Sequence, residues 1–344
     1  MSKKILVTGG TGYIGSHTVV ELQQAGYEVI IIDNLSNSNA DVIEGIVKIT
    51  GKRPIFEKID LVDMKSLEAV LNKHQGIDGI IHFAASKAVG ESVQKPLMYY
   101  RNNLVSLINL LELMPKHDIK GIVFSSSCTV YGEPDQNPID ENAPIKPATS
   151  PYGNTKQINE EIINDFVHSG APIKSVILRY FNPIGAHPSG EIGELPLGVP
   201  QNLVPFITQT GMGIREQLSV FGDDYDTPDG SCIRDFINVV DLSKAHVIAI
   251  ERMLENKSDD KVEIFNLGTG VGLSVLELIK VFEQVAGKPL NYKIADRREG
   301  DIEKIWAQAD KANNVLGWKA GETIEDTMAS AWNWQQKLRE KKII

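Results

Sequence analysis

The stretch KILVTGGTGYIG, residues 4–15, decides the fold. Its first part, with Lys3 to Thr8, is typical of a short buried strand, and a helical pattern from Ser16 to Ala25 follows the glycines directly. Gly9, Gly12 and Gly15 let the backbone turn tightly, approach a pyrophosphate closely and pack helix on strand. The helix N-terminus then offers free N–H groups and a positive dipole end to an anion. This order predicts a dinucleotide-binding start.

An acidic residue ends the next strand. Residues 27–32 form a second buried strand, and Asp33 follows, 21 residues beyond Gly12. A carboxylate there accepts both hydroxyls of an adenine ribose and repels a 2′-phosphate. A turn or capping role is the alternative for Asp33. The spacing favours the ribose, so we expect the cofactor NAD rather than NADP.

The bulk properties restrict the class of protein. With 344 residues, 42% of them hydrophobic and 23% charged, the chain resembles a globular protein of two lobes or one enlarged α/β domain. A formal charge of −10 argues against nucleic acid and anionic membrane as partners. No apolar run reaches the ~18 residues of a membrane span. Two cysteines exclude a disulfide framework, so we expect a reducing, cytoplasmic location.

Strand and helix patterns alternate through the first half of the chain. Strand-like runs at 54–59, 79–85, 121–124 and 175–180 are separated by helical patterns, among them 66–74 and 96–114. Such alternation predicts an α/β fold, a Rossmann-like doubly wound parallel sheet with helices on both faces. Ligands bind such sheets at the carboxyl ends of the strands.

A tyrosine and a lysine open the helix that follows the fifth strand. Tyr152 and Lys156 are four residues apart and so share a helical face, which we expect to point toward the strand ends and the hydroxyl of Ser127. A lysine ammonium and a positive nicotinamide ring each ~4 Å away would lower the pKa of the phenol by several units. Tyr152 would then act as general base. An isolated pair of this spacing is usually solvated helix surface; the dinucleotide-binding start favours the catalytic interpretation.

Together these features resemble the extended short-chain dehydrogenases/reductases. The strings GGTGYIGSH, HFAASKAVGES, SSSCTVYG and RYFNPIGAH resemble the UDP-galactose 4-epimerase (UDP-glucose 4-epimerase) family in particular, and the likeness extends to about Trp318. The resemblance implies a bound NAD that takes a hydride from sugar C4 and returns it to the other face. UDP-galactose and UDP-glucose would thereby interconvert through a 4-keto sugar. Tyr152 would take the C4 hydroxyl proton, assisted by Lys156, Ser127 and Thr129.

The resemblance also assigns binding residues. To NAD it assigns Gly9, Gly12, Tyr13, Ile14, Gly15, Asp33, Asn34, Asn37, Asp60, Leu61, Phe83, Ala84, Lys87, Asn102, Ser125, Tyr152, Lys156 and Tyr180. To the UDP-sugar it assigns Lys87, Ser127, Tyr152, Asn182, Asn202, Leu203, Phe221, Arg234, Arg298, Asp301 and Ile305. No His/Cys cluster has metal-ligand spacing, so we expect no metal.

The resemblance further implies two domains and a dimer. An NAD-binding Rossmann domain would cover 1–183, and a smaller mixed α/β domain for the UDP-sugar would cover 184–344. Part of 236–270 is expected to pack back on the first domain. Two chains would pair through helices at about 92–114 and 152–168.

Several alternatives stay open. Sister dehydratases typically carry an acidic residue beside the catalytic Ser/Thr, where this chain has Cys128. A UDP-uronate 4-epimerase would differ mainly in its contacts to sugar C6. Ile305 is intermediate in size between residues that exclude and admit N-acetylated sugars, so UDP-N-acetylhexosamines are expected to be poor but measurable substrates. A non-catalytic NAD-binding sensor is expected to have lost Tyr152 or Lys156, and both are present.

Overall fold

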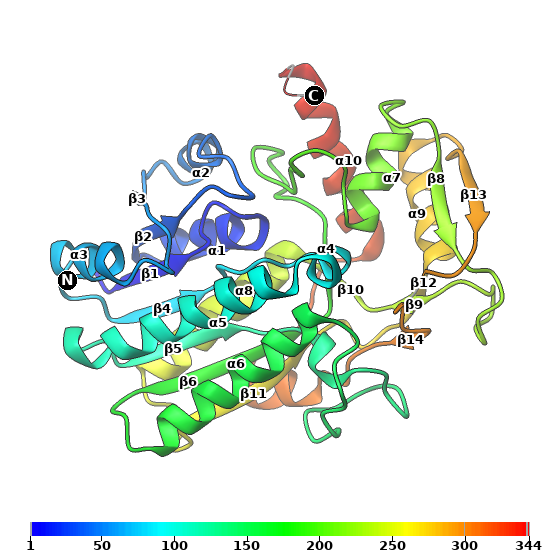
Figure 1. Cartoon of the computed structure of the whole chain (residues 1–344). Helices are drawn as coiled ribbons and strands as arrows, with labels where there is room; N and C mark the ends of the chain where they lie inside the picture. Colours follow the sequence, from blue (N-terminus) through cyan, green and yellow to red (C-terminus); the bar gives the residue numbers. More distant parts are fainter. Residues whose placement is uncertain (1, 299, 342, 344) are drawn as a thin grey trace.

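A seven-stranded parallel sheet organises the larger part of the protein (Figure 1). The computed structural model describes residues 2–298, 300–341 and 343. The strand order is β11-β6-β5-β4-β1-β2-β3, and every neighbouring pair is parallel. The bounds are β1 Lys4–Thr8, β2 Glu28–Asp33, β3 Ile55–Lys58, β4 Gly79–His82, β5 Gly121–Ser125, β6 Lys174–Tyr180 and β11 Val262–Leu267. The predicted doubly wound fold is confirmed.

Helices cover both faces of this sheet. They are α1 Tyr13–Gln24, α2 Val42–Thr50, α3 Met64–Lys73, α4 Val89–Gln94, α5 Pro96–Leu113, α6 Pro151–His168 and α8 Val239–Leu254. Successive strand residues point to opposite faces. Ile5 and Val7 therefore enter one buried core with α1 and α8, whereas Leu6 enters the other with α3, α5 and α6. A sheet covered on both faces explains why its strands are apolar throughout.

The smaller part is built from short strands and three further helices. The strands are β7 Asn182–Ile184, β8 Leu218–Phe221, β9 Ile233–Arg234, β10 Phe236–Asn238, β12 Leu273–Ser274, β13 Tyr292–Ala295 and β14 Lys304–Ile305. The helices are α7 Leu203–Gly211, α9 Val275–Ala286 and α10 Ile324–Glu340, and the short helical turns are η1 Pro115–His117, η2 Cys128–Tyr131 and η3 Ala312–Leu316. Parallel and antiparallel pairs both occur, as expected for a mixed α/β part.

The chain crosses between the two parts more than once. α8 packs against α1, and β11 extends the large sheet beside β6, so residues 239–267 return to the first part. The division at residues 183 and 184 stays a prediction. Among the described residues, no helix combines the length and apolar character needed to cross a membrane.

Two element boundaries differ from the predicted ones by three residues. The first helix begins at Tyr13 rather than Ser16, because the chain already turns into the helix at Gly12, whose φ and ψ are −72° and 174°. The fourth strand ends at His82 rather than at residue 85. Its partner β1 ends at Thr8, opposite His82, and the chain then turns at Gly9, whose φ is +70°.

The glycine turn between β1 and α1 leaves no room for side chains. A Cβ on Gly15 would lie 2.2 Å from the Gly9 carbonyl oxygen, and a Cβ on Gly9 would lie 2.8 Å from the Ala84 backbone nitrogen. Both neighbours are backbone atoms, which cannot rotate away. The contact between β1, the turn and α1 therefore requires glycine at these positions.

We predict that Gly15→Ala destabilises the protein by about 1–3 kcal/mol, because the new methyl group overpacks a backbone contact. Gly90→Ala is the matched control, since Gly90 lies in α4 with no atom within 4 Å of its added Cβ. There the helix preference of alanine should leave stability equal or slightly raised. Urea unfolding of both variants checks this, and equal midpoints would contradict it.

Candidate active site

A cleft of about 730 Å³ opens where β1, β2 and β4 end. It brings together residues that are far apart in the sequence, including all but one of the residues predicted to bind NAD. These lining residues are Gly9, Gly12, Tyr13, Ile14, Gly15, Asp33, Asn34, Asn37, Asp60, Leu61, Phe83, Ala84, Lys87, Asn102, Tyr152, Lys156 and Tyr180. Ser125 lies behind the cleft wall, where its carbonyl accepts a hydrogen bond from Lys156 Nζ at 2.7 Å.

The glycine turn forms the anion-binding end of the cleft. α1 begins at Gly12, which has no side chain to cap the first N–H groups. By contrast, Ser150 caps α6 and Ser274 caps α9. The open first turn of α1 fits a pyrophosphate, because its N–H groups and dipole are left to a ligand.

Asp33 ends β2 beside the glycine turn, where the ribose prediction requires a carboxylate. One carboxylate oxygen accepts the Thr11 N–H at 3.2 Å, and the other accepts the Leu35 N–H at 2.9 Å and the Ser38 hydroxyl at 3.1 Å. These bonds fix the carboxylate at the cleft wall, near the turn that would hold the pyrophosphate. Together with the glycine turn, this arrangement fits a dinucleotide with a free 2′-hydroxyl.

α6 carries the predicted catalytic pair into the same cleft. Ser150 accepts the Gly153 N–H at 3.2 Å and Pro151 occupies the first helical position, so the sequence starts the helix just before Tyr152. Tyr152 and Lys156 are 7% and 4% exposed, and the Lys156 ammonium lies 5.9 Å from the Tyr152 ring centroid. The prediction that both face the strand ends is confirmed by their place in the cleft wall.

Burial dominates the pKa of Tyr152. It raises this pKa well above its usual value, and Tyr180 adds to the effect, whereas the Ser127 hydroxyl acts in the opposite direction. Lys156 is itself buried, and burial lowers its pKa to about 8, opposed by Glu160. Desolvation of the phenolate therefore opposes the lowering that we expect from Lys156 and a nicotinamide ring, and that lowering stays a prediction.

Glu160 continues the face of α6 that carries Tyr152 and Lys156. Its carboxylate binds the Arg179 guanidinium, with Nη2 at 2.6 Å and Nε at 3.1 and 3.2 Å, and accepts the Ser126 hydroxyl at 2.5 Å. Arg179 Nη1 donates to the Tyr131 hydroxyl at 3.0 Å. Both charged side chains are buried. The sequence argument missed this pair, although Glu160 lies four residues beyond Lys156.

The segment between Glu191 and Asn202 forms a further wall of the cleft. Glu194 accepts a hydrogen bond from Asn202 Nδ2 at 2.5 Å, and its carboxylate lies 3.5 Å from Lys87 Nζ. Asn202 and Lys87 were predicted to bind the sugar nucleotide, and both line the cleft. Glu194 was not predicted, because a lone acid in a glycine-rich loop carries no pattern of its own.

Two of the predicted site residues have a buried polar atom that forms no hydrogen bond within the described part of the chain. Ser127 caps η2 through Thr129 N–H at 3.2 Å, while the Thr129 hydroxyl is buried without a protein partner. The same holds for Asn182 Oδ1, at the start of β7. Buried polar atoms normally have partners. These two atoms fit a ligand that brings hydrogen-bonding groups, in line with their predicted roles.

Arg234 and Ile305 face each other across the pairing of β9 with β14. Ile305 is 2% exposed and packs in one cluster with Cys128 and Tyr131. Arg234 acts on the same cluster, since its charge partly offsets the burial that raises the pKa of Cys128 to about 12. The second half of the chain thus contributes two predicted sugar-nucleotide residues next to the Ser127 turn.

Of the predicted substrate residues, Lys87, Tyr152 and Asn202 line the 730 Å³ cleft, whereas the remaining eight lie outside its lining: Ser127, Asn182, Leu203, Phe221, Arg234, Arg298, Asp301 and Ile305. Arg298 donates from Nη2 and Nε to the two carboxylate oxygens of Asp301, at 2.6 and 3.2 Å. Its guanidinium lies 5.6 Å from the Phe221 ring centroid. These three therefore form one group, in which Phe221 and Arg298 are exposed and Asp301 is mostly buried. Leu203 begins α7 and packs against the hydrophobic core of the smaller part, which includes Ile207 and Phe282. Among the described residues, no group of three or more His, Cys, Asp or Glu is placed to hold a metal.

Comparison with known proteins identifies the family. A family model described as GDP-mannose 4,6 dehydratase matches residues 6–331. UDP-glucose 4-epimerase of Bacillus subtilis (strain 168) is 51% identical over 331 residues, 96% of each chain. The chain belongs to the UDP-glucose 4-epimerase family. The predicted resemblance to the extended short-chain dehydrogenases/reductases is thereby confirmed.

Solved structures of the family support the same assignment. UDP-glucose 4-epimerase from Bifidobacterium longum, in complex with NAD+ and UDP, superposes with a TM-score of 0.92 at 49% identity, covering 97% of this chain and 98% of that one. The Stenotrophomonas maltophila enzyme, with bound NAD and formylated UDP-arabinopyranose, gives 0.94 at 44% identity, with 98% and 99% covered. The family likeness therefore spans both parts of the fold.

We predict that Glu160→Gln destabilises the protein by about 3–5 kcal/mol, because it leaves the Arg179 guanidinium buried without a carboxylate. Glu44→Gln is the matched control: Glu44 pairs with Arg53 at 2.6 Å, but both side chains are more than half exposed. That change should cost less than about 1 kcal/mol. Urea unfolding compares the two, and similar losses would contradict the role of burial.

Proposed function

We propose that the protein interconverts UDP-galactose and UDP-glucose with bound NAD. The observation that carries this proposal is a single cleft lined by the glycine turn, Asp33, Tyr152 and Lys156. A dinucleotide site and a buried phenol beside an ammonium are the two parts that oxidation and reduction at a sugar carbinol need. The full-length likeness to UDP-glucose 4-epimerases supports the choice of substrate.

The protein's own residues would divide the work as follows. The α1 N-terminus and Asp33 hold the pyrophosphate and the adenine ribose of NAD. When bound, NAD would supply the acceptor for the C4 hydride and the donor that returns it to the other face of the ketone. Tyr152 takes the proton of the C4 hydroxyl and gives it back, and Ser127 shares that proton through its hydroxyl.

Lys156 supplies the charge that makes Tyr152 a base. Its pKa of about 8 keeps the ammonium form dominant near neutral pH. The ammonium is held by the Ser125 carbonyl at 2.7 Å and lies over the Phe124 ring at 4.9 Å. A positive charge fixed there stabilises the phenolate against the burial that opposes it.

The second half would hold the UDP-sugar. We propose that Asn182, Arg234 and Ile305 contact the end of the substrate nearest Tyr152, since they lie around the Ser127 turn. The group of Phe221, Arg298 and Asp301 would receive the nucleotide, with Arg298 turning from Asp301 to the diphosphate. Leu203 and Asn202 would border the same path.

Other reactions of the fold are less well supported. Cys128 stands beside the catalytic Ser127 and Thr129, where sister dehydratases typically carry an acidic residue. Its thiol does not ionise near neutral pH, because burial raises its pKa to about 12. This supports epimerisation over dehydration. Ile305 is buried against Cys128 and Tyr131, which supports weak activity on UDP-N-acetylhexosamines.

The test of this function uses the purified protein as it is isolated. Incubation with UDP-galactose and no added cofactor should yield UDP-glucose, and added NAD should restore any activity lost on purification. Absence of UDP-glucose under both conditions would refute the proposal. Formation of a dehydrated or decarboxylated sugar would favour a sister reaction instead.

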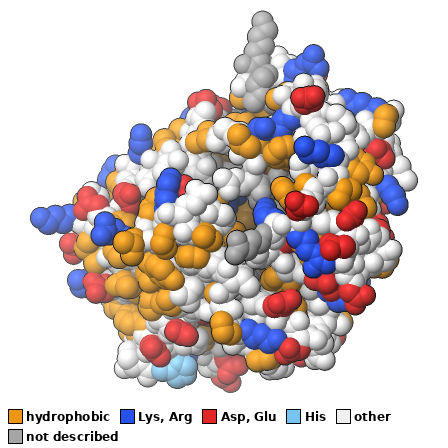
Figure 2. Space-filling model, turned by 45° about the vertical axis from the view of Figure 1, so that its right-hand side comes forward, with side chains coloured by type: hydrophobic (Ala, Val, Ile, Leu, Met, Phe, Trp, Pro, Cys, Tyr) orange, Lys and Arg blue, Asp and Glu red, His pale blue; other side chains and the backbone are white. Residues whose placement is uncertain are grey.

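We also propose a homodimer in a reducing compartment. Hydrophobic side chains gather on the left of the face in Figure 2. In α4 and α5, Val93 and Leu97 are 62% and 80% exposed, and α5 packs on α6. A large exposed apolar patch typically marks an interface. Both cysteines are free and buried, which supports the cytoplasm as the compartment.

We predict that Tyr152→Phe lowers the rate of UDP-glucose formation about 10²–10⁴-fold, because the general base is lost. UDP affinity should be unchanged, since the ring and its packing remain. Tyr292→Phe is the matched control, because Tyr292 is 40% exposed on β13. A Tyr152→Phe rate equal to that of the parent protein would refute the assigned role.

We predict that the parent protein has the mass of two chains in light scattering, and that Leu97→Glu gives the mass of one. The new carboxylate would be desolvated in the interface. Val271→Glu is the control, because Val271 is 63% exposed outside α4, α5 and α6. A dimer that survives Leu97→Glu would exclude this face.

A further inference from the structure

A second cavity, of about 1000 Å³, lies at the opposite edge of the large sheet. It is formed where β1, β4, β5, β6 and β11 begin, whereas the candidate active site lies where strands end. Its walls come from the end of α3, from η1, from the turn before β6 and from the end of α8. The proposed epimerase reaction uses none of these residues.

Positive charge accumulates in this cavity although the whole chain is acidic. Five lysines line it, against the two aspartates Asp78 and Asp118, which gives a charge of +3 with neutral histidines. The formal charge of the whole chain is −10. A local reversal of sign on an acidic protein attracts anions to one place.

Three of these lysines lie at the starts of neighbouring strands. Lys120 precedes β5, Lys174 begins β6 and Lys261 precedes β11. Backbone bonds of 2.8 Å, from Lys174 N to the Lys120 carbonyl and from Ser175 N to the Lys261 carbonyl, hold the three side by side. The pairing of β5 with β6 places Lys174 opposite Gly121, so Lys120 lies one residue out of register with it, whereas Lys261 directly precedes the partner of Ser175 and lies beside Lys174. The like charges of Lys174 and Lys261 therefore repel one another.

The protein compensates this repulsion only in part. Lys120 forms an ion pair with Asp118, and Lys174 Nζ donates to the Ser258 carbonyl at 2.7 Å. Asp78 is already occupied by the Lys4 N–H at 2.7 Å. Within the described part of the chain, Lys116 and Lys261 have no carboxylate within ion-pair distance. Cationic side chains that lack a carboxylate partner of their own, here Lys116 and Lys261, fit an anion that supplies one.

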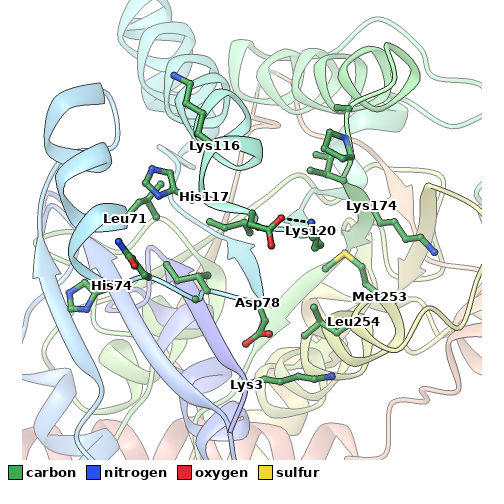
Figure 3. Close-up of a pocket in the computed structure, with 18 of the residues that line it drawn as sticks. Lys3, Leu71, His74, Asp78, Lys116, His117, Lys120, Lys174, Met253 and Leu254 are labelled. Atoms are coloured by element: carbon green, nitrogen blue, oxygen red, sulfur yellow. Dashed lines mark hydrogen bonds and ion pairs between the residues drawn. The ribbon is translucent and has the colours of Figure 1, made fainter. Parts of the chain in front are cut away.

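The arrangement around the cavity is visible in Figure 3. Lys116 and His117 lie on one side, Lys174 with Met253 and Leu254 on another, and Lys3 below, with Lys120 between them. Part of the wall between the cationic groups is apolar, because Ala171, Pro172 and Leu254 line it and are not fully buried. The volume is that of a nucleotide-sized ligand.

We propose that this cavity is a binding site for an organic polyphosphate, a ligand with several phosphate groups and an apolar or aromatic part. The lysine row on β5, β6 and β11 binds the phosphates, and the apolar wall receives the remainder. Lysine serves this purpose as a mobile point charge on a long stem. The site is separate from the dinucleotide cleft, because it lies at the amino ends of the strands.

Calorimetric titration of the holoenzyme tests the proposal. The protein is first saturated with NAD and UDP, so that the diphosphate sites of the active site are filled. ATP and inorganic tripolyphosphate are the two probes. We expect saturable binding that weakens as KCl is raised, since exposed charges are screened. Tighter binding of ATP than of tripolyphosphate supports a contact between the apolar part of the wall and the nucleoside. Equal binding assigns the site to polyphosphate alone and contradicts the role of the apolar wall.

The variants separate this site from general attraction of anions. Lys120→Gln, Lys174→Gln and Lys261→Gln combined should weaken binding at least about tenfold. The combined control Lys52→Gln, Lys58→Gln and Lys65→Gln removes the same charge from exposed positions outside the cavity and should change affinity less than twofold. Retained UDP binding shows that each variant is folded. Absence of saturable binding to the parent protein, or equal losses in both combined variants, would overturn the proposal.

Discussion

The buried ion pair between Glu160 and Arg179 is the interaction on which the candidate active site depends. It joins α6 to β6 inside the protein, where either charge alone would be costly. Lys156 and Tyr152 lie one and two turns earlier on the same face of α6, so the position of Glu160 sets their depth in the cleft. The Arg179 guanidinium also reaches Tyr131, which bonds Asn266 on β11 at 2.6 Å. The network therefore links α6 to β6 and β11.

Much of the fold and the cleft could be predicted because the signals are local. The glycine turn, Asp33, and the pair Tyr152 and Lys156 each lie in a short pattern whose spacing has a physical reason. Glu160 and Arg179 were missed because nothing in the sequence shows that a residue of a helix and one of a later strand share a buried contact. The group of Phe221, Arg298 and Asp301 was named by resemblance, but their mutual contacts depend on loops that carry no periodic signal.

The charge balance around Tyr152 shows why a sequence argument about pKa values is incomplete. Proximity of a lysine is visible in the sequence, but burial of both groups is not. His82 illustrates the same point: it stacks on Phe124 at 6.0 Å, and burial together with Lys156 lowers its pKa to about 3. It is therefore neutral and adds no second positive charge. The ammonium of Lys156 acts on Tyr152 without competition from this histidine.

The Tyr13 side chain links the glycine turn to the second half of the chain. It lies in the first turn of α1, and its hydroxyl donates to the Gly185 carbonyl at 2.6 Å. Gly185 opens the glycine-rich connection whose later part, with Glu194, walls the cleft. Order in the turn and order in this connection are thus coupled through one phenol. A ligand that orders α1 would also protect the connection from proteolytic cleavage. Binding in the cleft would then be measurable as slower cleavage of a peptide bond far along the chain.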